Sequence, residues 1–300
     1  MKIFYFPHVV LYELMKQFEP VDLIKLSFCS KTAHAVVKTF SKVEEDLDIY
    51  SMDGFGYSPK TPYRLKRWAE RFKHLHICQD VIQGCREITN YNCDLFKIPV
   101  STVDIYHETD VWMLDFVEQR QEQPLKNVYA YTSGTAKAYS RIMSCNATQH
   151  LRCGFSPPIN YRFDGKLPPA KKLSLTNGSW ISRKLLLGLE SQFVQLGHTS
   201  LRSSDIRALL RVWLNGGLAN LKHLTVMGTK FDDRIYEGIR DRLERVQEKV
   251  IYKGDFLYTG VELDTDAFHI RREDNIVATV KVFTGLFIMV VWPDMNGNDV

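Results

Sequence analysis

Several features that point to particular classes of protein are scarce in this 300-residue sequence. Only six cysteines occur, with no Cys-x-x-Cys pair, which argues against a disulfide scaffold and a thiolate zinc site. The most apolar run, Val282 to Trp292, covers 11 residues, whereas a membrane-spanning helix needs about 20. The formal net charge is only +4, too small to favour nucleic acid or a membrane surface as a partner. We therefore expect a soluble protein that binds neither.

Signals for catalysis and secretion are missing too. No GxSxG, HExxH or Walker-type loop occurs, and Gly54-Phe-Gly56 lacks the third glycine of a dinucleotide fingerprint. His74 and His76 could share a strand face, but with Cys78 alone beside them they do not form a recognisable zinc set. No signal-peptide cleavage site follows the apolar N-terminus. We expect no enzyme activity, no metal, no cofactor, and a location in the cytoplasm and/or the nucleus.

The first forty residues have the pattern of three short helices. Val10, Leu14 and Phe18 recur every four residues, which puts them on one helix face. Pro7 and Pro20 stand where helices begin, because a proline there loses no intrahelical hydrogen bond. A unit this small buries too little surface to fold firmly alone, so its apolar side needs a partner.

These residues also resemble a known family. Phe6-Pro7, Val10-Leu11, Leu14-Met15, Phe18 and the run Glu19-Pro-Val-Asp-Leu-Ile-Lys-Leu-Ser-Phe-Cys-Ser-Lys31 are similar to an F-box, with Phe6 and Leu14 in place of the usual leucine and isoleucine. The resemblance implies docking on the Skp-type adaptor of cullin–RING ubiquitin ligases, and through it contact with cullin. The alternative is that the same residues form the core of an N-terminal helical cap. The expected adaptor contacts are Phe6, Pro7, Val10, Leu11, Leu14, Met15, Phe18, Pro20, Leu23, Leu26 and Cys29.

A triplet of apolar positions, Φ-x-x-Φ-x-Φ, recurs through the middle of the chain. Its first positions are 72, 100, 125, 148, 170, 191 and 221, and the spacing approaches the about 20–29 residues of leucine-rich repeats. Helical patterns fill the gaps at 111–118, 136–143, 181–189 and 205–214, and another is expected at 232–249. Ser203 or Ser204 should cap the fourth of these helices, and Gly216 should end it. Alternating strands and helices predict an α/β fold with a parallel sheet, in an irregular leucine-rich-repeat-like solenoid.

The residues between the apolar positions should form a polar face. Successive side chains of a strand point to opposite sides, so the polar ones share the open face of the sheet. Tyrosine and arginine carry much of the binding energy at protein interfaces, which suits recognition of a target protein. The residues we expect to bind a target are His74, His76, Asp104, Tyr106, Tyr129, Tyr131, Arg152 and His223.

From Phe256 the pattern changes to period two, with a turn at 271–275 and a last strand at 287–292. This predicts a small antiparallel β meander that caps the solenoid. The runs at 205–217 and 221–226, together with the closing Val-Trp-Pro, are similar to the type-2 F-box-associated region, which nematodes carry in large numbers. That resemblance implies a substrate-binding region attached to the F-box.

The sequence thus predicts four parts. Residues 1–45 are the F-box, 46–70 a linker and basic helix, 71–250 the repeat-like recognition region and 251–300 the β meander. The interpretation is a substrate-receptor subunit of an SCF-type cullin–RING ubiquitin ligase. The alternative is a scaffold that uses the same surfaces outside any ligase. The sequence does not name the target protein.

Overall fold

The computed structural model describes residues 6–42, 47–50, 81–131, 134–228, 231–253 and 261–294, with residues 297 and 299. The chain forms two compact units, one of residues 1–102 with 116–123 and one of residues 103–115 with 124–300. The apolar triplet expected at 72–77, including His74 and His76, lies outside the described residues, as does most of the predicted linker and basic helix.

The first unit contains the three predicted N-terminal helices. They are α1 (His8–Met15), α2 (Pro20–Ser27) and α3 (Lys31–Phe40), and their positions confirm the sequence prediction. Pro7 is the N-cap residue of α1, Pro20 opens α2, and the Ser30 side chain caps α3 by accepting a hydrogen bond from the Ala33 backbone N–H at 3.0 Å. The unit continues with β1 (Leu47–Tyr50) and α5 (Val81–Phe96), and β2 (Val100–Ile105) begins in it and ends in the second unit.

The second unit is built on a mixed sheet whose parallel half follows the apolar triplets. The strands run parallel in chain order, with each apolar position paired with the matching position of its neighbour, so Val128, Leu151, Leu173, Val194 and Leu224 form one buried row. This confirms the predicted parallel α/β sheet, and its leucine-rich-repeat character stays a prediction. The strands are β3 (Asn127–Ala130), β4 (His150–Cys153), β5 (Lys172–Leu175), β6 (Phe193–Thr199) and β7 (His223–Gly228).

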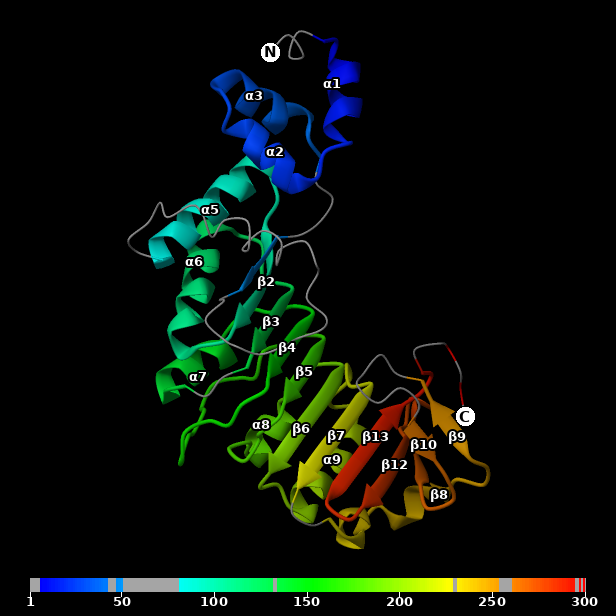
Figure 1. The fold of residues 1–300 in the computed structure, drawn as a ribbon. Coiled ribbons are helices and arrows are strands. Elements are labelled where there is room, and N and C mark those ends of the chain that lie inside the picture. Colours follow the sequence, from blue (N-terminus) through cyan, green and yellow to red (C-terminus); the bar gives the residue numbers. More distant parts are fainter. Residues whose placement is uncertain are drawn as a thin grey trace. The chain divides into compact units, whose positions relative to one another are not determined.

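Helices between the strands cover one face of this sheet (Figure 1). Thr135 and Ser182 cap α7 and α8 through their hydroxyl groups. In α9 the predicted serine cap is wrong, because Arg202 is the N-cap residue and its backbone N–H donates to Asp205 Oδ2 at 2.9 Å. Gly216, at φ +86°, follows that helix as predicted. The helical segments are η2 (Glu108–Val111), α6 (Trp112–Arg120), α7 (Ala136–Met143), α8 (Arg183–Leu187) and α9 (Ser203–Leu214).

The helix predicted at 232–249 is wrong. Two short 3-10 turns, η3 (Asp233–Tyr236) and η4 (Arg240–Arg242), occupy its first half, and β8 (Leu243–Arg245) follows them. Gly238 lies between the turns at φ +75°, a left-handed conformation that interrupts a helix. The strand β8 pairs with β11, and a helix at these residues could not form those strand hydrogen bonds. Three of the four apolar residues that suggested the helix, Ile235, Ile239 and Val246, are nevertheless buried in this path, and Leu243 is half-buried.

The C-terminal meander is present, but it extends the sheet itself. β11 (Phe268–Arg271), β12 (Val277–Phe283) and β13 (Leu286–Val291) are antiparallel, and β13 pairs with β7. From β3 onward, the strand order of the sheet is therefore β3-β4-β5-β6-β7-β13-β12-β11-β8. A separate two-stranded sheet, β9 (Val250–Tyr252) with β10 (Val261–Leu263), packs its apolar side chains against Ile288 and Val290 of β13.

Candidate protein-interaction surfaces

The core of the first unit joins the N-terminal helices to α5. Leu95 and Phe96 of α5 are buried together with side chains of α1, α2 and α3. Three of the expected adaptor contacts, Leu11, Met15 and Leu23, belong to this core, and Leu23 is only 3% exposed. The set of expected adaptor contacts therefore includes side chains that stabilise the helices. Leu14 and Leu26 are half-buried and pack against the same core, and Pro20 is half-buried.

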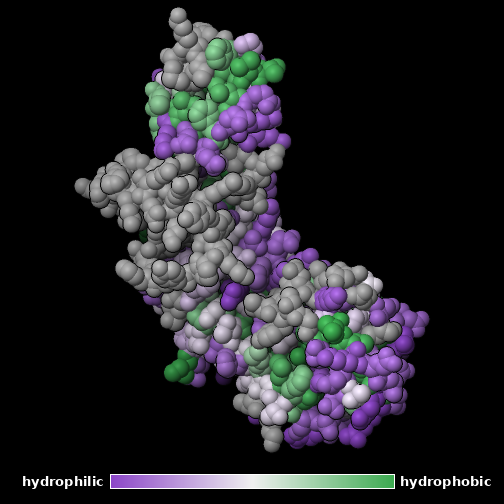
Figure 2. Space-filling model, turned by 45° about the vertical axis from the view of Figure 1, so that its right-hand side comes forward, coloured by the Kyte–Doolittle hydropathy of each residue, from purple (hydrophilic) through white to green (hydrophobic). Residues whose placement is uncertain are grey.

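The remaining expected contacts lie at the surface. Phe6, Pro7, Val10, Phe18 and Cys29 are exposed, and Figure 2 shows hydrophobic surface over the three helices at the top of the view. Sequence reasoning missed two further exposed residues, Val9 at 74% and Phe28 at 65%. Contiguous exposed apolar side chains of this kind mark a surface that binds another protein. The sequence could have indicated both, because each is an apolar residue outside the four-residue spacing that predicted the helix face.

Tyr91 of α5 links the N-terminal helices to the rest of the first unit. Its hydroxyl lies 2.6 Å from Ser27 Oγ and 3.2 Å from His34 Nδ1. Ser27 donates its own proton to the Ile24 carbonyl at 2.6 Å, so Tyr91 donates to Ser27 and accepts from His34. The ring of Phe28 stacks on the Tyr91 ring, with centroids 4.7 Å apart and planes 10° apart. These contacts attach α2 and α3 to α5 through polar as well as apolar groups.

In the second unit, the polar face predicted for the sheet is open at its β3–β4 end. The rings of Tyr106 and Tyr131 stack at 4.9 Å, and Tyr129 pairs in register with Arg152 of the next strand. Tyr131 is exposed, while Tyr106, Tyr129, Arg152 and Asp104 are half-buried. Burial is the main reason that the pKa of Tyr131 is raised to about 12, and the charge of Asp104 adds to it. The structure thus brings together five of the eight residues expected to bind a target.

His223, a sixth member of that set, is wrongly assigned to an open surface. It is 1% exposed, its Nε2 lies 2.8 Å from Thr225 Oγ1, and its ring lies 5.8 Å from that of Tyr252. The β9–β10 sheet covers this end of the face, and burial lowers the pKa of His223 to about 4. The alternation along β7 placed His223 on the correct face, but the cover comes from residues far along the chain.

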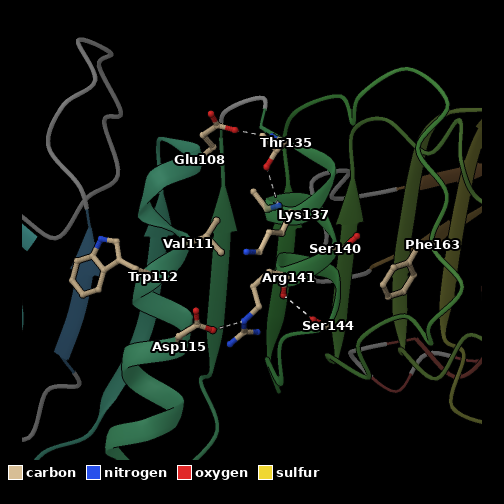
Figure 3. A pocket seen from close by; sticks show the side chains of 11 residues that line it. Glu108, Val111, Trp112, Asp115, Thr135, Lys137, Ser140, Arg141, Ser144 and Phe163 are labelled. Atoms are coloured by element: carbon tan, nitrogen blue, oxygen red, sulfur yellow. Dashed lines mark hydrogen bonds and ion pairs between the residues drawn. The ribbon is translucent and has the colours of Figure 1, made fainter.

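A groove of about 600 Å³ lies on the helical side of the second unit, between η2–α6 and α7 (Figure 3). Two contacts cross it. Glu108 Oε2 accepts from the Thr135 backbone N–H at 2.8 Å, and Arg141 Nε donates to Asp115 Oδ1 at 2.7 Å. Both carboxylates are thus engaged in holding the helices together. The serine hydroxyls of its lining bond elsewhere, Ser140 with the Tyr161 hydroxyl and Ser144 with the Arg141 carbonyl, so the groove has the character of an ordinary groove between packed helices.

Two further searches of the described residues concern metals and membranes. Within the described ranges, no group of three or more His, Cys, Asp or Glu side chains is placed to hold a metal ion. Among the helices that the structure describes, none has both the length and the apolar character that crossing a bilayer requires.

Comparison with known families identifies the N-terminal helices. Residues 3–44 match the F-box domain. The chain carries an F-box. This domain supports a general role as an F-box adaptor of SCF-type ubiquitin ligases and implies binding to a Skp1-type adaptor, and F-box proteins are generally non-enzymatic. Searches among curated proteins and among solved structures gave no match.

Proposed function

We propose that this protein is the substrate-receptor subunit of an SCF-type ubiquitin ligase. The observation that carries the proposal is the F-box match at residues 3–44, where Val9 and Val10 of α1, and Phe6 just before it, expose apolar side chains. A helical unit with an apolar surface suits docking into a groove of a partner protein. Such a receptor raises the local concentration of a target near the ubiquitin-charged enzyme, and its own side chains perform no covalent step.

The open end of the polar face, at Tyr106, Tyr129, Tyr131, Arg152 and Asp104, is proposed to bind the target. Tyrosine supplies contact area at low entropic cost, and arginine supplies charged hydrogen bonds, a combination enriched at binding hot spots. The parallel strand array supports the leucine-rich-repeat-like interpretation. The resemblance of the runs at 205–217 and 221–226 is the basis on which a type-2 F-box-associated region is proposed. The proposal places the protein in the cytoplasm and/or the nucleus, with cullin as an indirect partner.

Substitution of an exposed F-box residue tests the adaptor role better than deletion. Removing residues 1–45 would uncover Leu95 and Phe96 of α5, which pack against the F-box helices. Val10→Asp puts a charge on an exposed apolar surface while leaving that core intact. We expect the purified chain to bind a Skp-type adaptor, Val10→Asp to abolish binding, and Ile159→Asp, on an exposed loop of the second unit, to preserve it. Equal adaptor binding by Val10→Asp and the unmodified chain would contradict this docking surface.

Two further measurements separate the ligase role from its alternative and locate the target surface. Recovery of cullin together with the adaptor supports a ligase subunit, whereas adaptor without cullin favours a scaffold outside any ligase. With a target identified by proximity labelling, Arg152→Ala and Tyr131→Ala should weaken target binding and leave adaptor binding unchanged. Unchanged target binding by both variants would move the target site elsewhere on the chain.

A further inference from the structure

The apolar surface of the F-box does not end with the F-box helices. Phe28 directly follows α2, and the α5 residue Tyr91 covers only one side of its ring. The side chain still exposes 65% of its surface. An aromatic ring left so open loses most of the stabilisation that burial would bring, unless another molecule covers it.

The apolar side of α5 continues in the same region. Ile88 precedes Tyr91 by three residues and Leu95 by seven, a spacing that places the three on one side of a helix. Leu95 is buried against the F-box helices, but Ile88 exposes 43% of its surface. The side of α5 that holds the F-box in place is therefore longer than the F-box surface that it contacts.

Phe28 and Ile88 thus flank Tyr91, and we call these three residues the Phe28–Ile88 patch. Cys29, an exposed residue of the expected adaptor contacts, directly follows Phe28 in the chain, so the patch adjoins the predicted docking surface at that residue. The hydrogen bonds of Tyr91 to Ser27 and His34 fix its ring before any partner arrives. A surface that is already ordered loses little conformational entropy on binding.

We propose that the adaptor-docking surface extends beyond the F-box onto α5, with the Skp-type adaptor covering the Phe28–Ile88 patch. This inference rests on the proposed function. The partner is the adaptor, because the patch adjoins the surface that the F-box offers to it and belongs to the same unit. The F-box and α5 then act as one docking element, and residues outside the F-box match contribute to its affinity.

The test is the dissociation constant of the full-length chain for a purified Skp-type adaptor. Phe28→Ala should weaken binding ~10-fold, the effect of losing one aromatic anchor of moderate strength, and Ile88→Ala a few-fold. Ile159→Ala serves as the matched control, because Ile159 is 93% exposed in the second unit and should not affect the dissociation constant. Thermal unfolding of each variant shows whether its fold is intact.

Hydrogen exchange provides a second readout that needs no variant. Amides of residues 84–92 should exchange more slowly once the adaptor is bound to the unmodified chain. If Phe28→Ala and Ile88→Ala bind like the unmodified chain and these amides keep their rates, the extension onto α5 is overturned while adaptor docking stands. If the unmodified chain does not bind the adaptor, both the proposed function and this inference are overturned.

Discussion

The two ends of one sheet face differ in what covers them. At the β3–β4 end, Tyr131 and Arg152 reach the surface, whereas at the β7–β13 end His223 is enclosed beneath Tyr252 of β9. Both ends have the same alternation of apolar and polar residues along their parallel strands, so the pattern alone predicts one continuous polar surface. The comparison shows that alternation decides which side chains share a face, and that a distant segment decides whether water reaches it.

The covered end is also built differently at its centre. Thr279 of β12 accepts a hydrogen bond from Trp292 Nε1 at 2.7 Å and lies 2.8 Å from His269 Nδ1. The ring of Trp292 meets that of Tyr252 edge-on at 5.4 Å. The polar groups of Trp292, Thr279 and His269 are thus paired with one another beneath the surface, as burial requires. The open end offers its tyrosines and arginine to a partner instead.

The largest expected effect separates the two ends by stability. Tyr252→Ala removes a ring that is 1% exposed and leaves a cavity over His223, so the free energy of unfolding should fall by about 3–5 kcal/mol. Tyr131→Ala, the matched change at the open end, should cost less than about 1 kcal/mol. Denaturant unfolding of both variants measures the difference. Equal losses would show that the open end is also part of the core.

A pH dependence of stability should come from the covered end. Burial holds the pKa of His223 at about 4, below its usual 6.5, so the unfolded chain binds the proton first as the pH falls. Stability from this residue is therefore complete above about pH 6.5 and declines until about pH 4, by roughly 3 kcal/mol in all.

The measurement is the free energy of unfolding across that pH range, compared with His223→Gln, whose side chain does not titrate. The variant should lose less stability on acidification than the unmodified chain. Burial also lowers the pKa of His269, and this contribution is common to both proteins. Parallel pH profiles would mean that His223 does not supply the dependence.

The smallest expected effect is at the open end. Arg152 is half-buried, and among the residues that the structure describes no carboxylate forms an ion pair with it. Arg152→Ala should therefore change the free energy of unfolding by no more than about 0.5 kcal/mol. A loss well above that in thermal or denaturant unfolding would assign Arg152 a structural role and weaken its place in the target site.

The F-box shows what a local sequence pattern predicts and what it does not. Pro7, Pro20 and Ser30 act within a few residues of themselves, so the sequence predicted three helices at the correct positions. Leu23 was expected at the adaptor interface and lies in the core, because it is buried with side chains of α1, of α3 and of α5, the last dozens of residues later in the chain. The exposure of Phe28 was missed because it too depends on α5, whose Tyr91 stacks on the Phe28 ring and leaves 65% of the side chain exposed.

Residues 232–249 show a local pattern overruled by its surroundings. The spacing of Ile235, Ile239 and Val246 fits a helix, and each is buried, but Gly238 and pairing with β11 favour turns and a strand. Periodicity reports which residues avoid water, and more than one backbone path can bury the same set.

By itself the sequence determined the F-box helices, the parallel strands and the faces that their side chains share, since these follow from contacts between near neighbours and from fixed periods of helix and strand. Only the tertiary structure decided that Leu23 is core, that Phe28 and Ile88 are open, and that His223 is covered while Tyr131 is not. Those outcomes depend on which distant segment packs over a given side chain, and the periodicity of a single helix or strand does not predict that packing.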